Sequence, residues 1–197
     1  MNSDADNPHA DGLERMDGRR SIPSRLLGNP GPTDRQLARL LTSAVRVPDH
    51  GRLSPWRVLL IRGQTRAALG EILVARALER DPAVGGAVLD KERQRFLFAP
   101  VIITVIARLT PDHKVPEQEQ LLSGGAVCFS LLQAAQALGF GAQWLTGWLA
   151  YDPVITSKLG LTGNERVLGF IHVGTSRDVV PERERPDPQT LLSELRL

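Results

Sequence analysis

The sequence predicts an α+β fold in which a mixed central sheet is covered by helices. The chain has 197 residues, a length that suits one ordinary domain with a sizeable core. Residues 101–107 form a continuous apolar run after Pro100, which is typical of a central strand covered on both faces. The predicted helices outnumber the strands and do not alternate with them, which favours α+β over a doubly wound α/β fold.

Capping residues mark the first clear helix in the N-terminal half. Thr33 is a good N-cap and forms a capping box with Gln36, and Pro48 ends the helix. Apolar residues then recur on one face of the helix. The same reasoning gives a turn-rich stretch over residues 22–32, a strand over residues 56–62 and helices over residues 64–80 and 90–99.

The C-terminal half shows equally clear helix ends. Gly139 suits the C′ position of a long helix over residues 117–138. Asp152 is an N-cap followed by Pro153 at the first helical position, and Gly160 closes that helix. Strands are predicted over residues 101–107, 141–145 and 166–173.

These elements divide the chain into three segments. Residues 1–18 are interpreted as a flexible N-terminal tail or, in part, a frayed first helix. Residues 19–177 form the predicted domain. Residues 178–197 are charged and rich in proline, which indicates an extended C-terminal arm rather than core.

Composition excludes several classes of protein. The formal net charge is +2, and no Lys/Arg block with interleaved aromatic residues occurs, so nucleic-acid binding is not expected. The longest apolar run, over residues 101–107, is far shorter than the roughly 20 residues that span a bilayer, so no membrane association is expected. The N-terminus lacks a secretory signal pattern, and Cys128 is the one cysteine, so we expect a cytoplasmic protein without an intrachain disulfide.

The common catalytic motifs are also missing. There is no phosphate-binding loop of the GxxxxGK[ST] type and no Gly-x-Ser-x-Gly elbow. The histidines are far apart and the cysteine lies inside a helix, so no metal site is predicted. The four histidines are His9, His50, His113 and His172. Because neither a nucleophile nor a metal is indicated, an organic cofactor is the remaining common route to difficult chemistry.

Two polar segments in the N-terminal half are candidates for ligand binding. Arg19-Arg20-Ser21 offers two guanidinium groups and a hydroxyl that could bind a phosphate. Exposed arginines are common, however, so the same three residues could also be a basic pair in contact with solvent. The segment 48–56 is a polar turn bracketed by prolines, which is where functional residues often lie. An ordinary turn, with Trp56 packed into the core, fits it equally well.

Two further candidates follow predicted secondary structure in the C-terminal half. The glycines of segment 139–147 allow the backbone to approach a flat ligand closely, and a helix C-cap followed by a buried strand is the alternative. Segment 173–177 ends a strand with glycine, small polar residues and arginine. It either adds a phosphate contact or simply ends the sheet.

Several short motifs are each weak signals, but their joint order and spacing along the chain form a specific pattern. They are Arg19-Arg20-Ser21, Arg46-x-Pro48-Asp49-His50 with Pro55-Trp56, Ala99-Pro100-Val101-Ile102-Ile103-Thr104-Val105, His113-Lys114-Val115-Pro116 with Glu119-Gln120, Gly139-Phe140-Gly141 through Trp144 and Gly147, and Gly169-Phe170 with Gly174-Thr175. From about Arg19 to about Thr175 the chain resembles the FMN-dependent nitroreductase family, most closely its compact bacterial branch, the YdjA-like minimal nitroreductases.

The resemblance implies a nitroreductase-like α+β fold and an obligate homodimer, with one FMN in each of two sites at the dimer interface. The domain over residues 19–177 would then bind FMN, and Arg46 and His50 would contact the flavin of the partner subunit. The resemblance implies no protein catalytic residue. The implied cofactor-binding residues are Arg19, Arg20, Ser21, Arg46, His50, Trp144, Leu145, Thr146, Gly147, Gly174 and Arg177.

The implied activity is that of an NAD(P)H oxidoreductase. NAD(P)H would be the co-substrate, and a nitro compound or a similar two-electron acceptor would be reduced by a ping-pong hydride-transfer mechanism. Two alternatives remain open: a flavoenzyme of the same fold specialised for another oxidation or a dehalogenation, and a non-catalytic flavin-binding module. The chain departs from the family pattern at Ser54, where relatives commonly have Gln, and at Leu145-Thr146, where the branch often has Arg-Ser. These changes bear on substrate preference and flavin potential.

Overall fold

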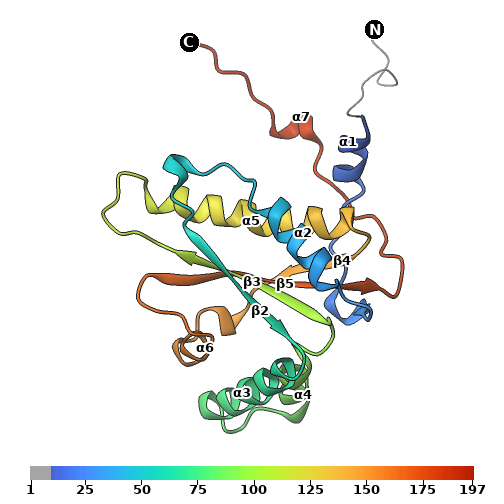
Figure 1. The fold of residues 1–197 in the computed structure, drawn as a ribbon, viewed down its shortest axis with the longest axis vertical. Coiled ribbons are helices and arrows are strands. Elements are labelled where there is room, and N and C mark those ends of the chain that lie inside the picture. The colour runs from blue at the N-terminus through green and yellow to red at the C-terminus, as the bar shows by residue number, and fades with distance from the viewer. Residues whose placement is uncertain (1–9) are drawn as a thin grey trace.

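The computed structural model describes residues 10–197 and places a five-stranded sheet between two groups of helices (Figure 1). The strands run in the order β1-β5-β3-β2, and β4 pairs with β5. Their bounds are β1 Leu27–Gly28, β2 Trp56–Arg62, β3 Val101–Arg108, β4 Gly141–Leu145 and β5 Glu165–Ser176. The α+β architecture is therefore as predicted.

Every pairing in this sheet is antiparallel, so the prediction of a mixed sheet was wrong. The reason lies in the connection between β2 and β3. Arg62 pairs with Val101, so the chain leaves and re-enters the sheet at the same end. The helices of this connection lie beyond that end of the pair, as Figure 1 shows, and do not carry the chain across the sheet. A long return of this kind makes neighbouring strands antiparallel.

Strand β3 is buried on both faces, as its unbroken apolar run predicted. Alternate side chains of a strand point to opposite faces. Ile103 and Val105 pack with helices α2 and α5, whereas Ile102 packs with α3, α6 and the turn η4. The helices and turns are α1 Ala10–Asp17, η2 Ser24–Leu26, α2 Asp34–Ala44, η3 His50–Arg52, α3 Thr65–Arg80, α4 Gly86–Gln94, α5 Glu117–Ala137, η4 Trp148–Ala150, α6 Pro153–Lys158 and α7 Pro188–Leu191.

The predicted caps are confirmed. Thr33 and Gln36 form the reciprocal capping box of α2, and the side chain of Asp152 accepts hydrogen bonds from the first turn of α6, with Pro153 at its start. Gly139 follows α5 with φ of +82°. These local signals fix where the helices begin and end.

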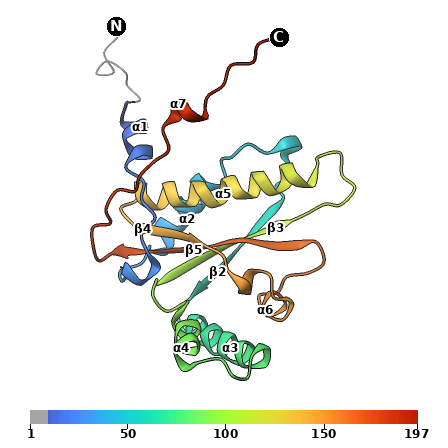
Figure 2. The same cartoon turned by 180° about the vertical axis from the view of Figure 1, so that it is seen from behind.

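The bounds of other elements differ from the prediction. Helix α4 begins and ends earlier than the predicted 90–99, because Phe96 is buried against the sheet and the chain must leave the helix to enter β3. Strand β5 is longer than predicted, because its last residues pair with β1. Within the predicted N-terminal tail, residues 10–17 form α1, and residues 1–9 lie outside the described residues. The C-terminal arm is extended except for α7. It leaves the body on the same side as α1 (Figures 1 and 2).

Candidate functional site

Residues 19–24 run beside strand β4, which brings the first and third candidate segments together. The backbone N–H of Ile22 donates to the carbonyl oxygen of Ala142 over 3.0 Å. The N–H of Ser24 donates to Oε1 of Gln143 over 2.6 Å. The two segments therefore form one wall of the molecule although they are more than a hundred residues apart in the chain.

A cluster of charged side chains gathers at the start of this wall. Nη1 of Arg19 donates to Oγ of Ser21 over 3.3 Å. Arg20 forms an ion pair with Glu182 of the C-terminal arm, and Glu182 also pairs with Arg185, with 3.0 Å between Nη2 of Arg185 and Oε1 of Glu182. The arm is thus anchored at residues 19–21.

Cations dominate the surroundings of Arg19. Partial burial, followed by repulsion from Arg185, Arg20 and Arg183, holds the pKa of the Arg19 guanidinium below its ordinary value. Four guanidinium groups therefore lie in this cluster, and Glu182 forms ion pairs with two of them. An anion with several acceptor oxygens would relieve the repulsion and accept charge-assisted hydrogen bonds.

A cavity of about 370 Å³ opens between β4 and the end of α4. Pro23, Phe98 and Leu145 supply its apolar wall, and Ser24 and Gln143 supply polar groups. A mostly apolar cavity with a few convergent polar groups suits a planar organic ligand. A short segment links the cavity to the arginine cluster, since only two residues separate Ser21 from Ser24, which lines the cavity.

Three cations also line this cavity: Arg25, Lys91 and Arg95. Arg95 forms a bidentate ion pair with Glu92. Arg25 and Lys91 have no ion pair with any residue of the described range 10–197. The cavity therefore has a positive potential, which favours a ligand that carries or develops negative charge.

Larger cavities lie elsewhere but do not collect the candidate residues. One of about 460 Å³ lies between α2 and α5, beside Arg15 and Arg39. Another of about 530 Å³ lies between loops at the far end of the sheet, beside Arg108 and Glu165. None of the cofactor-binding residues predicted from sequence lines either cavity, so size alone does not locate the site.

The predicted flavin-contact segment at the end of β4 splits between two faces. Leu145 faces the 370 Å³ cavity, whereas the indole of Trp144 packs on Gly169 and its Nε1 donates to the carbonyl oxygen of Leu168 over 3.0 Å. Thr146 is exposed. Gly147 adopts φ of +123° and lies beside the Arg95 guanidinium, a backbone conformation that glycine tolerates best.

The two residues predicted near a phosphate at the end of β5 are used in packing. A Cβ at Gly174 would lie 2.7 Å from Cδ of Pro100 and 2.8 Å from the carbonyl oxygen of Gly28, so only glycine fits there. The Arg177 side chain lies against Gly28. Their predicted contacts with a phosphate remain predictions.

His50 lies at the opposite end of helix α5 from the arginine cluster, and Arg46 follows the end of α2, where its N–H donates to the carbonyl oxygen of Ser43. Nδ1 of His50 is 2.7 Å from Oε2 of Glu119, in the first turn of α5. At the other end, Nε2 of Gln136 donates to the carbonyl oxygen of Arg15, four residues before Arg19. At 1.5 Å per residue the two ends are about 25 Å apart. One chain therefore does not bring all the predicted site residues together.

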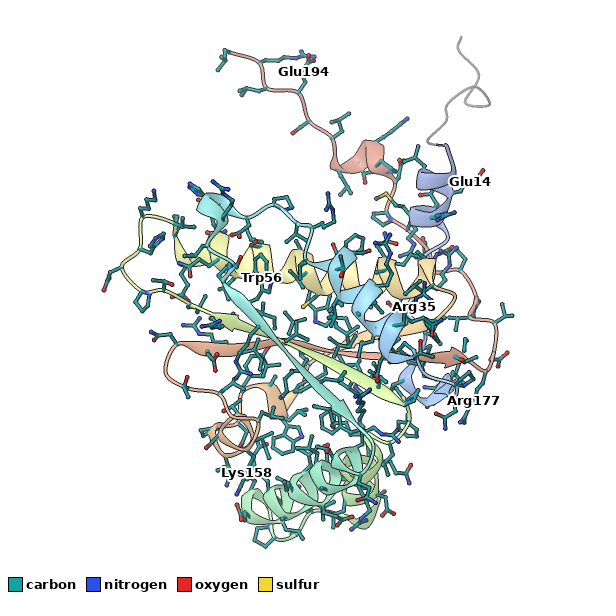
Figure 3. The ribbon with its side chains drawn as sticks, viewed as in Figure 1. Glu14, Arg35, Trp56, Lys158, Arg177 and Glu194 are labelled. Atoms are coloured by element: carbon teal, nitrogen blue, oxygen red, sulfur yellow. The ribbon has the colours of Figure 1, made fainter. Side chains whose placement is uncertain are left out.

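Figure 3 shows where two of the candidate segments end. Trp56 marks the end of the loop that carries His50, and Arg177 marks the end of β5, on the other side of the molecule. Within the range 10–197, no group of three or more His, Cys, Asp or Glu side chains is placed to hold a metal ion. No helix in the same range is both long and apolar enough to cross a membrane.

The loop that carries His50 is held in an unusual backbone conformation. Arg52 and Ser54 have φ of +53° and +48°, which costs a non-glycine residue roughly 1 kcal/mol or more. Oγ of Ser123 donates to the carbonyl oxygen of Pro48 over 2.6 Å, and the N–H of Ser54 donates to Oδ2 of Asp49 over 2.8 Å. These contacts fix the loop and leave His50 exposed at the surface.

Sequence reasoning missed several residues of this site. Arg183 and Arg185 belong to an arm whose charge was taken as a sign of solvent exposure, and Arg25, Lys91 and Arg95 stand in segments without a recognisable motif. The one usable signal was the density of arginine in the arm. Gln120, part of a predicted motif, has a structural role, since its buried amide holds the loop around Thr110 and Val115 through three hydrogen bonds.

A family model and a sequence relative both assign the chain to the same family. Residues 16–175 match the model of the "Nitroreductase family". The Escherichia coli (strain K12) protein "Putative NAD(P)H nitroreductase YdjA" is 37% identical over 167 residues, which cover 84% of this chain and 88% of that protein.

Solved structures show the same fold. A nitroreductase-like family protein from Bacillus cereus has a TM-score of 0.80 at 24% identity and covers 93% of this chain and 95% of its own. A Desulfovibrio desulfuricans protein crystallised in complex with FMN has a TM-score of 0.72 at 24% identity, with 96% and 98% covered.

Proposed function

Because the chain belongs to the nitroreductase family, we propose that it is an FMN-dependent NAD(P)H oxidoreductase that reduces nitro compounds or similar two-electron acceptors. The observation that carries this proposal is the short segment that links the arginine cluster to the 370 Å³ cavity. Residues 19–24 run from one to the other along β4. A ligand with an anionic end and a flat ring matches that arrangement.

The residues present fit FMN at both ends. A phosphate monoester carries close to two negative charges at neutral pH, and the cluster of Arg19, Arg20, Arg183 and Arg185 has a surplus of positive charge. The ring would lie in the cavity, where the amide of Gln143 offers hydrogen-bonding groups beside an apolar wall. The donor set and the shape agree with the same cofactor.

Bound FMN would supply the chemistry, by taking a hydride from NAD(P)H and passing two electrons to the acceptor in a ping-pong sequence. The protein's own side chains have simpler tasks. The arginines hold the phosphate, Leu145 and Phe98 keep water from one side of the ring, and the cations Arg25 and Lys91 favour negative charge in the cavity.

We further propose that the active unit is a homodimer in which Arg46 and His50 reach the cavity of the partner subunit. Helix α5 exposes Leu122 and Phe129, 64% and 41% respectively. These side chains lie about two turns apart and so share one face. An exposed apolar stripe on a long helix supports burial against a second copy.

The C-terminal arm supports the same assembly. Its apolar side chains are almost fully exposed beyond the body of the molecule: Val179, Leu191, Leu192, Leu195 and Leu197. An arm of this kind gains stability only by packing on another surface. An obligate dimer of this family would bury on the order of 2,000 Å² or more.

The proposed function is tested by an absorption spectrum of the purified protein, followed by anaerobic titration with NADH and then NADPH. Flavin bands that bleach on titration, and return when a nitroaromatic compound is added, are the expected result. Bound flavin that neither nucleotide reduces would indicate a specialised flavoenzyme or a non-catalytic module. A colourless protein that rejects added FMN would contradict the proposal.

A further inference from the structure

A buried carboxylate pairs with one of the residues that line the cavity. Glu92, at the end of α4, is only 4% exposed, and it binds Arg95 through two hydrogen bonds, of 2.7 Å to Nε and 2.5 Å to Nη2. Burial raises the pKa of Glu92, and hydrogen bonds and charge from Arg95, with a hydrogen bond from Trp148, more than offset it, so the pKa lies below its ordinary value. Glu92 is therefore ionised at neutral pH.

The carboxylate of Glu92 occupies only one edge of the Arg95 guanidinium. Nε and Nη2 of Arg95 are used by Glu92, whereas Nη1 lies beside Gly147, 3.6 Å from where a Cβ of that residue would stand. Within residues 10–197, Nη1 has no hydrogen-bond acceptor. Arg95 also lines the 370 Å³ cavity together with Gln143 and Leu145.

Stability alone does not account for such a pair. Taking two charges out of water costs several kcal/mol per ion, and apolar residues of similar size often stabilise a protein as well or better. The next residue along the chain, Phe96, is buried in the apolar core. A fixed guanidinium with one free edge at a cavity wall is instead what recognition of an electron-rich ligand requires.

We propose that Glu92 is a positioning residue that fixes Arg95 so that Nη1 donates to the ligand ring in this cavity, and does so more strongly when the ring is reduced and carries more negative charge. This inference rests on the proposed function, since it assigns a contact to FMN. It adds to that function a pair of residues that sets the relative affinity for oxidised and reduced cofactor, and hence the reduction potential.

The test measures the reduction potential of bound FMN and the dissociation constant of oxidised FMN in three variants. In Glu92→Gln/Arg95→Gln, which removes both charges and leaves two polar side chains, reduced FMN should bind about tenfold more weakly relative to oxidised FMN. For a two-electron couple this lowers the potential by about 30 mV. An unchanged potential would overturn the proposal.

The single variant Glu92→Gln separates positioning from charge. Removing a negative charge near the ring should by itself raise the potential, whereas releasing Arg95 from the cavity wall should lower it. The proposal expects the lower value, and a higher value would contradict it. Arg95→Lys keeps the positive charge but not the fork geometry, so it should resemble the double variant, and a wild-type potential in this variant would also contradict the proposal.

A matched control is available at the other end of the sheet. Arg57 and Glu165 form a bidentate pair of the same kind, with 2.6 Å and 2.9 Å separations, away from the 370 Å³ cavity. Arg57→Gln/Glu165→Gln should leave the potential unchanged. If wild-type protein does not bind FMN, the proposed function fails. If wild-type protein binds FMN but Glu92→Gln or the double variant loses oxidised FMN altogether, the pair assembles the site, and the assignment to the reduced ring is wrong.

Discussion

The indole of Trp144 packs against Gly169, and Nε1 of Trp144 donates to the carbonyl oxygen of Leu168 over 3.0 Å. The glycine is required because a Cβ at position 169 would overlap the five-membered ring of the indole. Trp144 is directly followed by Leu145, which lines the candidate cavity. The contact therefore fixes the end of β4 from the face opposite to the site.

Gly169→Ala should destabilise the protein by about 1–3 kcal/mol, because the added methyl group forces a shift in a packed strand. A thermal melt with Trp fluorescence measures both the stability and the indole environment. Since Phe is smaller at the overlapping position, Trp144→Phe in the same chain should recover most of the loss. Additive losses in the double variant would show that the two residues do not interact.

Arg19→Gln and Arg20→Gln should each weaken FMN binding by roughly 10-fold to 100-fold, since hydrogen bonds to charged groups contribute about 1.5–3 kcal/mol. Fluorescence titration of flavin-free protein with FMN measures this. Lys158→Gln, on α6 far from the cluster (Figure 3), is the charge-matched control and should bind FMN normally. Wild-type affinity in both arginine variants would place the phosphate elsewhere.

Glu182→Gln should tighten FMN binding by about twofold to fivefold. Its carboxylate pairs with Arg20 and Arg185 and so competes with the phosphate for them, and a half-exposed ion pair contributes at most about 1 kcal/mol. Isothermal titration compares it with Glu184→Gln, which neutralises a neighbouring carboxylate of the same arm. Weaker binding in Glu182→Gln would mean that the carboxylate orders the arm and does not compete with the ligand.

Mixing two inactive variants tests the shared site directly. Arg19→Gln/Arg20→Gln and Arg46→Gln/His50→Ala should each bind FMN poorly. If each site takes one part from either chain, a mixed dimer contains one intact site and one doubly damaged site. Random exchange at equal concentrations should then restore about one quarter of the wild-type flavin content. No recovery after confirmed subunit exchange would place all four residues in sites of one chain.

Stability should fall as the pH drops from about 6.5 toward 4 because of His172. Burial, and then the charge of Arg95, lowers the pKa of His172 to about 4 in the folded protein, against an ordinary 6.5 in the unfolded chain. Between these values only the unfolded state takes the proton, so unfolding is favoured by up to about 3 kcal/mol, and no penalty remains above pH 6.5.

His172→Phe should remove this dependence, because the imidazole stacks on Phe96 with 6.0 Å between ring centroids and its Nδ1 has no hydrogen-bond partner among residues 10–197. Thermal melts at pH 5 and pH 7.5 measure it. The variant should lose less stability than wild type between the two conditions. An equal loss would assign the acid sensitivity to other groups.

Much of the fold could be predicted from short stretches of sequence. The capping box of Thr33 and Gln36, the Asp152–Pro153 start and the Gly139 end depend on residues within one turn of each other. The apolar run of β3 likewise reports burial on both faces without reference to its partners. For the site, the sequence predicted that Arg19–Ser21 and the end of β4 bind a ligand.

Tertiary structure alone decided which of these pieces meet. Ser24 and Gln143 are 119 residues apart, and Arg185 reaches the Arg19 cluster only because the arm turns back across residues 19–21. The packing of the elements also places His50 at the far end of α5, and the connections between strands make every pairing in the sheet antiparallel. Hydrophobic periodicity and capping residues predict structure over a few residues. Contacts between distant segments depend on how whole helices and strands pack, which no single stretch of sequence predicts.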